Sequence, residues 1–309
     1  MSVLFTFPGQ GAHKAGMLHG LADHPEAART LGEATAALGR DVLALDDAGA
    51  LRSTVAVQLC LLVAGVAAAR VLTGLGATPD MVAGLSIGAW PAAVVAGVLD
   101  FADAVRLVEL RGRLMEDAYP SGYGMTTIGG LTRRQLEPLL AQVHRPDNPV
   151  YLANLNAPRQ LVVAGRTTAL DAVAALALRH GAQRAERLAV PVPSHCPLLE
   201  DGARTLACAM AQVPRRRPRI TWISGSVARA LFDGERIGAD LAANMARPVL
   251  WDDTMRHAWE RGARIALEMP GGSVLTRLAQ EGDFAAGTAL CVDGNRLDTL
   301  VAAARGAQG

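Results

Sequence analysis

The stretch Gly84-Leu85-Ser86-Ile87-Gly88 is the part of the chain best suited to chemistry. It lies between a short apolar run, Met81 to Leu85, and a helical run, Ile87 to Leu99. This is the context of a nucleophile elbow, in which a strand turns sharply into a helix and presents a serine hydroxyl. A Cβ two residues before or after that serine would collide with the strand and helix, which explains both glycines. The alternative is a glycine-rich surface turn, because a chain with 32 Gly can contain this pattern by chance.

A serine nucleophile needs a general base, and His195 is the favoured candidate. It lies in Pro191-Val-Pro-Ser-His-Cys-Pro197, where the prolines prevent a helix. A stiff loop can aim an imidazole with little conformational entropy left to lose. The alternative is an ordinary loop histidine. The other six histidines lie in the N-terminal loop or among polar residues of helical runs, where solvation is expected.

Arg111 is the next informative residue. The helical run Phe101 to Ala118 carries an apolar stripe at spacings of three and four, and Arg111 falls inside it. Arg113 falls on the polar side, four residues after Glu109, as in a surface ion pair. A buried guanidinium needs an anion. That anion is either a structural Asp or Glu or the carboxylate of a substrate held by two parallel hydrogen bonds.

The stretch Phe7-Pro-Gly-Gln-Gly11 ends the first expected strand. Its glycines allow backbone N–H groups to approach a ligand closely. In serine acyl-transfer enzymes one oxyanion donor comes from such a loop, and the other is the N–H after the nucleophile. Taken alone, the loop is equally compatible with a plain strand-to-helix turn.

Composition excludes several classes of function. The formal net charge is +1 at pH 7, so a broad nucleic-acid surface is not expected. The longest apolar run, Leu59 to Ala69, is too short to span a bilayer, and no signal peptide is evident. Lys14 is the sole lysine, and no P-loop is present, which disfavours Schiff-base and P-loop chemistry. The four cysteines form no CxxC pair, which fits a reducing cytoplasm and gives no metal-ligand spacing.

The elements that must position these residues follow a layered α/β order. Strands are expected at Val3–Phe7 and Met81–Gly84, and helices at Thr54–Gly74, Ile87–Leu99 and Phe101–Ala118. Strands alternating with helices indicate a parallel sheet. After His195 the chain resumes helices and strands.

The segment between these two parts has a different order, βαββαβ, which is that of a small ferredoxin-like unit. Its strands are expected at Gly124–Ile128, Val150–Asn154, Gln160–Ala164 and Arg184–Val190, and its helices at Thr132–His144 and Thr168–His180. We therefore expect a large discontinuous α/β domain, residues 1–122 and 196–309, and an inserted ferredoxin-like domain, residues 123–195. The catalytic cleft should lie between them.

Taken together, five motifs resemble those of malonyl-CoA:acyl-carrier-protein transacylases in order and approximate spacing. They are Phe-Pro-Gly-Gln-Gly, Gly-Leu-Ser-Ile-Gly, Glu109-Leu-Arg-Gly-Arg-Leu-Met115, Pro-Ser-His195 and Glu268-Met-Pro-Gly-Gly. The resemblance covers nearly the whole chain. It implies an α/β-hydrolase-like core with a parallel sheet, a Ser–His pair without a third carboxylate, and no metal or redox cofactor.

The resemblance also implies a role for each matching residue. Ser86 would be the nucleophile and His195 its base, while Arg111 would grip the free malonyl carboxylate. The N–H groups of Gln10 and Ile87 would form the oxyanion hole. Asn244 aligns with a position that is Gln in many relatives and would orient the histidine through its main-chain oxygen. Its side chain is therefore expected to matter little.

Two departures indicate a subtype. The common fatty-acid-synthesis enzymes carry His and Glu where this chain has Leu85 and Ala89. With Tyr119-Pro-Ser-Gly-Tyr-Gly124, this pattern looks more like the epsilon subunit of bacterial malonate decarboxylase. That subunit moves malonyl from malonyl-CoA to the prosthetic-group thiol of a dedicated carrier protein. The alternative within the family is a fatty-acid-synthesis transacylase.

The implied partners are malonyl-CoA, an acyl carrier protein and, for the subtype, other decarboxylase subunits, with no nucleic acid or membrane and a cytoplasmic location. Arginine-rich stretches at 133–134 and 215–219 could dock an acidic carrier or form a solvated face. Two rivals belong to other classes. A serine thioesterase or hydrolase usually places its His near the C-terminus, whereas more than a hundred residues follow His195. A carrier-binding scaffold would not need Ser86, His195 and Arg111 together.

Overall fold

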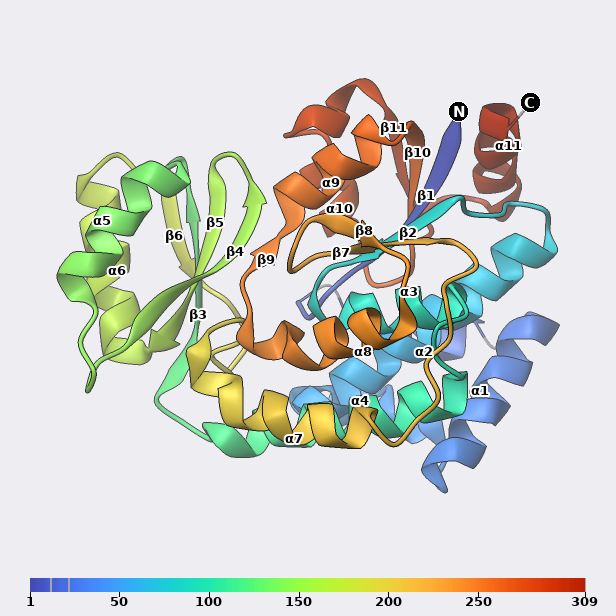
Figure 1. Ribbon diagram of the computed structural model, residues 1–309, viewed down its shortest axis with the longest axis horizontal. Coiled ribbons are helices and arrows are strands. Elements are labelled where there is room, and N and C mark those ends of the chain that lie inside the picture. Colours follow the sequence, from blue (N-terminus) through green and yellow to red (C-terminus); the bar gives the residue numbers. More distant parts are fainter. Residues whose placement is uncertain (12, 22, 309) are drawn as a thin grey trace.

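The computed structural model describes residues 1–11, 13–21 and 23–308 and contains two sheets (Figure 1). The six-stranded sheet has the order β11-β10-β1-β2-β7-β8 and lies at the centre of the larger part. Its strands are β1 (Ser2–Phe7), β2 (Met81–Gly84), β7 (Thr221–Ser224), β8 (Arg229–Leu231), β10 (Ala263–Glu268) and β11 (Thr288–Cys291). All neighbouring pairs are parallel except β7 with β8. The expected parallel α/β core is confirmed.

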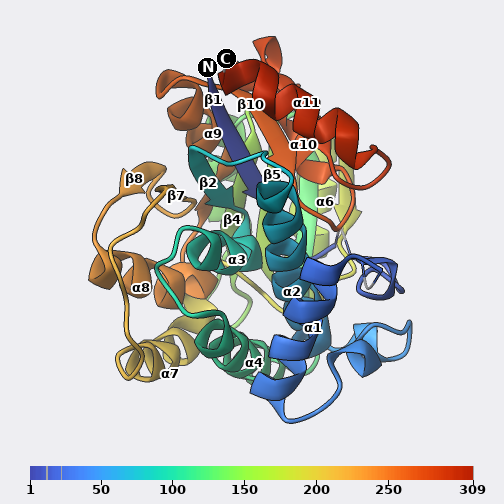
Figure 2. The same ribbon diagram turned by 90° about the vertical axis from the view of Figure 1, so that its right-hand side faces the viewer.

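Both faces of the central strand β1 are buried, as is typical of parallel sheets covered by helices on each side. Val3, Phe5 and Phe7 face the larger core, and Leu4 faces a second core with Met255 and other apolar residues. The N- and C-termini lie close together at one end of the molecule (Figure 2). There the N-terminal ammonium donates to the carbonyl of Ala307 at 2.6 Å.

The helices of the larger part differ in which core they cover. The larger core contains residues of α2 (Thr54–Gly74), α3 (Ala89–Val95), α4 (Phe101–Ala118), α7 (Glu200–Met210), α8 (Gly234–Ala243) and α11 (Leu297–Gln308), and α1 (Pro25–Leu38) packs beside α2. The second core contains residues of α9 (Trp251–Glu260) and α10 (Val274–Ala279).

Helix α2 is the central helix of this arrangement. Among the described residues it alone is long and apolar enough to cross a membrane by length and composition. Most of the helix is nevertheless buried against α1, α3 and α4, as a core helix of a folded domain is. Its observed bounds match the helix predicted from Thr54 to near Gly74.

The second sheet is built mainly from the middle of the chain and lies to the left in Figure 1. Its order is β6-β3-β5-β4-β9, and the pairs among β3 to β6 are antiparallel. Its strands are β3 (Tyr123–Gly129), β4 (Val150–Ala157), β5 (Gln160–Arg166), β6 (Arg184–Arg187) and β9 (Val249–Leu250), and its helices are α5 (Arg133–Val143) and α6 (Thr167–Arg179). The βαββαβ order expected of residues 123–195 is the order observed along the chain.

One strand of this sheet comes from outside the middle segment. The two residues of β9 pair in parallel with Asn154 and Leu155 of β4. Helix α9 begins at Trp251, directly after this strand. We propose that residues 123–195 form an inserted ferredoxin-like domain, which β9 joins to the larger part by main-chain pairing.

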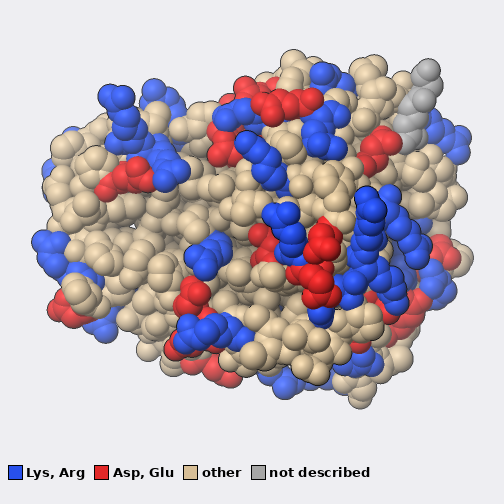
Figure 3. All heavy atoms as spheres, viewed as in Figure 1, with Lys and Arg blue, Asp and Glu red and all other residues tan. Residues whose placement is uncertain are grey.

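Three arginines of the arginine-rich stretches are paired with acids. Arg215 binds Glu235 at 2.6 Å, and Arg216 contacts both carboxylate oxygens of Asp100 at 2.8 and 2.9 Å. Arg133 binds Glu137 one helical turn away at 2.7 Å. Basic and acidic side chains are mixed over the face shown in Figure 3. These contacts favour the solvated-face interpretation of both stretches.

Candidate active site

Ser86 stands on a strained turn between β2 and the 3-10 helix Ser86–Gly88 that leads into α3. Its φ is +57°, a left-handed value that non-glycine residues rarely adopt. A Cβ on Gly84 would lie 2.0 Å from the carbonyl carbon of Gly88, and one on Gly88 would lie 2.0 Å from the carbonyl oxygen of Phe7. Both glycines are therefore required by backbone-to-backbone contact. The nucleophile-elbow geometry predicted from the sequence is present.

Gly88→Ala should lower the free energy of unfolding by about 3–5 kcal/mol, because neither the helix nor β1 can move away without breaking sheet contacts. Gly32→Ala is the matched control, since a Cβ at this position in α1 meets nothing within 4 Å. It should be neutral or stabilising by up to about 1 kcal/mol. Urea unfolding of both variants measures the difference, and an equally small effect at Gly88 would contradict the packing argument.

His195 meets Ser86 inside the protein. Its Nε2 lies 2.7 Å from the Ser86 Oγ, and the imidazole is almost fully buried. The chain before α7 holds the ring in place, because His195 has a φ of +63° and its N–H donates to the carbonyl of Met245 at 2.7 Å. The structure thus brings together two residues that lie 109 positions apart in the sequence.

The contacts of His195 fix which ring nitrogen carries the proton. Nδ1 lies 2.8 Å from the carbonyl oxygen of Asn244 and 3.2 Å from that of Arg247. Carbonyl oxygens only accept, so Nδ1 carries the proton and Nε2 is left to accept the Ser86 hydroxyl proton. Burial, and then the charge of Arg111, lower the pKa of His195 to about 4, so the ring is neutral near pH 7. A neutral imidazole with a free Nε2 is a general base.

Arg111 lies on α4 directly behind the serine and is fully buried. Its Nη2 lies 3.4 Å from both the Ser86 Oγ and the Asn244 Oδ1, and its Nη1 donates to the Gln58 Oε1 at 2.6 Å. Within residues 1–11, 13–21 and 23–308, no carboxylate forms an ion pair with it, and its buried Nε is without a partner. Burial lowers the pKa of Arg111 to about 9, so it remains charged at pH 7. The structural ion pair considered as an alternative is absent from the described chain.

Gln58 is a site residue that the sequence analysis did not identify. It lies within the apolar helix α2 and is fully buried. Its amide oxygen accepts from Arg111, and its Nε2 faces the Gln10 Oε1 at 3.5 Å and the Met115 Sδ at 3.3 Å. A lone amide inside an otherwise apolar helix requires a buried partner. A single amide in this apolar helix was therefore the sequence feature that could have indicated a site residue.

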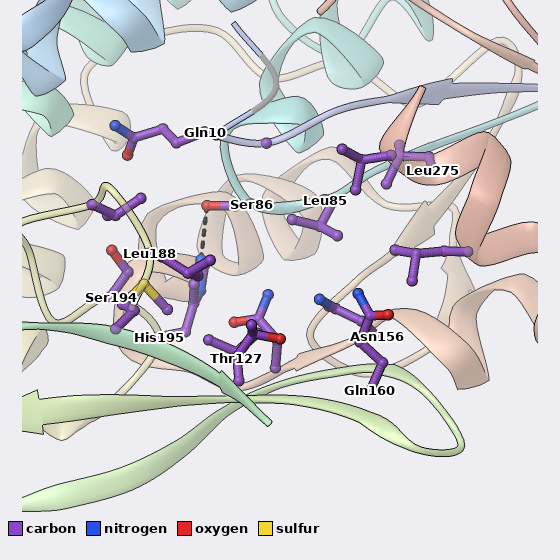
Figure 4. Close-up of a pocket in the computed structure, with 18 of the residues that line it drawn as sticks. Gln10, Leu85, Ser86, Thr127, Asn156, Gln160, Leu188, Ser194, His195 and Leu275 are labelled. Carbon is purple, nitrogen blue, oxygen red and sulfur yellow. Dashed lines mark hydrogen bonds between the residues drawn. The ribbon is translucent and has the colours of Figure 1, made fainter. Parts of the chain in front are cut away.

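The loop after β1 packs against the elbow. A Cβ on Gly9 would lie 2.8 Å from the Leu85 Cδ2 and 3.5 Å from the Ser86 Cβ, so this loop approaches the serine as closely as glycine permits. Gln10, the next residue, lies across from Ser86 in the cavity (Figure 4). Ile87 follows Ser86 directly and is buried. Both residues expected to form the oxyanion hole are thus beside Ser86.

A cavity of about 470 Å³ opens in front of Ser86. Gln10, Leu85 and Leu275 line it from the larger part, and Thr127 and Gln160 line it from the second sheet (Figure 4). Ser86 therefore lines the cleft predicted between the two parts. Within the described chain, no group of three or more His, Cys, Asp and Glu could hold a metal ion.

Two further polar residues of the cavity were not predicted. Asn154 and Asn156 project from β4 into its lining, and the side-chain oxygen of each is buried without a partner in the described structure. A buried unpaired acceptor is costly. Each of these oxygens is almost inaccessible to solvent, and the described structure supplies no donor to it.

Glu268 is the acidic residue of the Glu268-Met-Pro-Gly-Gly motif. It ends β10, and its carboxylate accepts from the N–H groups of Leu275 and Thr276 at 3.0 and 2.7 Å and from the Thr276 hydroxyl at 2.6 Å. These bonds satisfy the free N–H groups at the start of α10, which lines the cavity. Glu268 is a structural support of the cavity wall.

This geometry agrees with comparisons to known proteins. Residues 4–290 match the acyl transferase domain family. The chain belongs to this family. It is therefore an acyltransferase, as the sequence analysis predicts. The malonyl CoA-acyl carrier protein transacylase of Escherichia coli K12 is 38% identical over 282 residues, which cover 89% of this chain and 91% of that protein. The Bacillus subtilis transacylase is 32% identical over 284 residues, with 90% of each chain covered.

Solved structures of other members of the acyl transferase family have the same fold. The malonyl CoA-acyl carrier protein transacylase of Coxiella burnetii superimposes with a TM-score of 0.93 at 33% identity, covering 99% of this chain and 97% of that chain. A malonyl-transacylase in complex with a type II PKS acyl-carrier protein superimposes with a TM-score of 0.91 at 34% identity, covering 99% and 100%. These relatives carry the transacylase name and not that of a malonate decarboxylase subunit.

Proposed function

We propose that this acyltransferase moves a malonyl group from malonyl-CoA, through an ester on Ser86, to the prosthetic thiol of an acyl carrier protein. The observation that carries the proposal is Arg111, a buried cation without a carboxylate partner in the described structure, 3.4 Å from a serine activated by His195. An acyl group with its own free carboxylate supplies the missing anion. The named transacylase relatives support the same substrate and acceptor.

The acylation step uses the protein's own groups. As the Ser86 Oγ attacks the thioester carbonyl, the His195 Nε2 takes its proton. The N–H groups of Gln10 and Ile87 stabilise the oxyanion of the tetrahedral intermediate, each worth about 3 kcal/mol. The C–S bond then breaks, and the imidazolium returns the proton to the CoA thiolate. The carbonyls of Asn244 and Arg247 keep Nδ1 protonated and stabilise the imidazolium.

The second step reverses the first with a new thiol. The carrier thiol loses its proton to the His195 Nε2 and attacks the malonyl ester. The tetrahedral intermediate collapses, and the Ser86 oxygen leaves with the proton from the imidazolium. The side chains of Asn154 and Asn156 line the cavity in which a pantetheine arm, which both CoA and a carrier present, would lie. One cavity thus serves donor and acceptor in a ping-pong sequence.

A second candidate acceptor is the carrier of a malonate decarboxylase. Leu85 and Ala89 support it, because they replace the polar residues of the common transacylases at the elbow. Leu85 lines the cavity, and Ala89 is buried. The reaction at Ser86 is the same for either acceptor. The comparisons reported above favour the fatty-acid-synthesis type of carrier.

Acyl transfer to two purified carriers separates these candidates. The protein is incubated with malonyl-CoA and its mass is measured, which should show one malonyl adduct on Ser86. The adduct is then offered to a phosphopantetheinylated carrier and to a carrier with the decarboxylase-type group. Transfer to the first identifies a fatty-acid-type enzyme, and transfer only to the second identifies the decarboxylase subtype. Rapid malonyl-CoA hydrolysis without any thiol acceptor would instead support the thioesterase rival, and no adduct would support a scaffold.

The pH dependence of acylation should report His195. Because protonated imidazole cannot accept the serine proton, kcat/KM should fall as pH drops through the pKa of about 4. With acetyl-CoA, whose transfer does not use the Arg111 charge, it should therefore stay level from neutral pH down to about 5 and decline below that. Stopped-flow measurement of Ser86 acetylation gives the profile. An acidic limb near 6.5, the ordinary pKa of histidine, would show that burial does not control this group.

A further inference from the structure

Asn244 contacts both functional groups of the site. Its main-chain oxygen accepts from the Nδ1 of His195 at 2.8 Å, while its side-chain oxygen accepts from the Nη2 of Arg111 at 3.4 Å. Only 1% of Asn244 is exposed. The sequence predicts that the Asn244 side chain matters little. This side chain nevertheless contacts Arg111, which binds the substrate carboxylate in the proposed function.

The other end of the Asn244 side chain leads away from the site. Its Nδ2 donates to the Ser226 Oγ at 3.3 Å, and the Ser226 side chain lies near enough to the carboxylate of Asp240 to lower its pKa, against the effect of burial. Asp240 lies one turn before Asn244, and its carbonyl accepts the N–H of Asn244. The Ser224 hydroxyl also donates to Asp240, at 2.9 Å. A polar path therefore runs from Asp240 to Arg111.

Donor and acceptor roles give this path a single direction. Burial raises the pKa of Asp240 to about 6, so its carboxylate is ionised at pH 7 and only accepts, which orients the Ser226 hydroxyl toward it and leaves a lone pair for the Asn244 Nδ2. The amide of Asn244 must then present its oxygen to Arg111, which only donates. Each group in the path therefore offers a donor where its neighbour needs one and an acceptor where its neighbour donates.

Ser224 lies outside this path although it also binds Asp240. Its Oγ accepts the N–H groups of Ser226 and Val227, both at 3.1 Å, and so directs its own proton to Asp240. It makes no contact with Asn244 among the hydrogen bonds of the described structure. Ser224 is therefore a matched comparison for Ser226.

We propose that Asp240, Ser226 and the Asn244 side chain are positioning residues that hold Arg111 toward Ser86, and thereby set the preference for acyl groups with a free carboxylate. The inference rests on the proposed malonyl transfer. Among the residues that the structure describes, Arg111 is otherwise held by the Gln58 amide oxygen alone, apart from Ser86 itself. Neutral amide oxygens orient the guanidinium without neutralising it. The negative charge of Asp240 stays two side chains away, so it does not compete with a substrate carboxylate.

The test compares malonyl-CoA with acetyl-CoA as donors for acylation of Ser86. In Ser226→Ala the ratio of the two kcat/KM values should fall about fivefold or more, the size expected for one lost hydrogen bond to an amide. Ser226→Thr retains a hydroxyl and should restore the ratio. Asp240→Asn keeps the shape but can donate to Ser226, which reverses the path, so its ratio should also fall. Ser224→Ala should keep the ratio within about twofold of the original protein, even where thermal unfolding shows a loss of stability.

The outcomes separate the inference from the function on which it rests. If the unmodified protein forms no malonyl-Ser86, the proposed function fails whatever the variants do. If it does form the ester, and folded Ser226→Ala and Asp240→Asn keep its malonyl-to-acetyl ratio, the positioning role is overturned. An equal loss for both donors also overturns it, because a purely structural role lowers both rates together. If Ser226→Ala does not fold, the isosteric Asp240→Asn decides the question.

Discussion

Ser86→Ala should accept no malonyl group and should lose transacylase activity by on the order of 10⁴-fold or more, as removal of a serine nucleophile does elsewhere. The Ser86 hydroxyl lies 2.7 Å from the His195 Nε2, and the left-handed turn presents it to that base. Alanine fits the turn about as well as serine, so folding should be retained. Mass spectrometry after incubation with malonyl-CoA measures the adduct.

Ser121→Ala provides the control for this experiment. Ser121 is exposed in the loop before β3 and lies outside the cavity lining. Its replacement should leave the adduct and the transfer rate unchanged. A folded Ser86→Ala protein that still acquires a malonyl group would remove Ser86 from its assigned role.

The parts of the site that the sequence predicts well depend on local constraints. Gly84 and Gly88 are required because backbone atoms occupy the space that a Cβ would need. Both glycines belong to one five-residue motif, so the sequence shows this requirement directly. Arg111 interrupts a helical apolar stripe, so its burial follows from periodicity. The contact between Ser86 and His195 is different, since 109 positions separate them. Residue chemistry and the family resemblance predicted that pair, whereas local structure alone did not.

The features that were missed depend on contacts between distant segments or on very short elements. The strands β8 and β9 contain only three and two residues, too few for a recognisable pattern. The expected helix Ile87–Leu99 is a 3-10 turn followed by α3, which ends at Val95 before the positive φ of Gly97. Gln58 and the side chain of Asn244 show their roles only when Arg111 is placed beside them. Local sequence patterns predict apolar residues at buried positions, so buried polar residues with a function depart from these patterns.

Arg111→Met should have opposite effects on activity and stability. Methionine fills much of the volume without a charge, and a buried cation lacking a carboxylate partner costs folding free energy in the free protein. The variant should therefore gain about 1–3 kcal/mol in free energy of unfolding, less what is lost by leaving the Gln58 oxygen unpaired. The malonyl carboxylate would meanwhile lose its partner. The preference of the enzyme for malonyl-CoA over acetyl-CoA, measured as the ratio of the two kcat/KM values, should fall by about 10²- to 10³-fold.

Arg113→Met is the matched control, two residues along the same helix. Arg113 is exposed and pairs with Glu109 at 2.8 Å, an interaction worth less than about 1 kcal/mol. Neither selectivity nor stability should change much. If Arg111→Met retained the malonyl preference, the buried guanidinium would be a structural residue after all. A gain in stability together with lost selectivity would instead show that this cation is kept in the core for the substrate, because the fold is more stable without it.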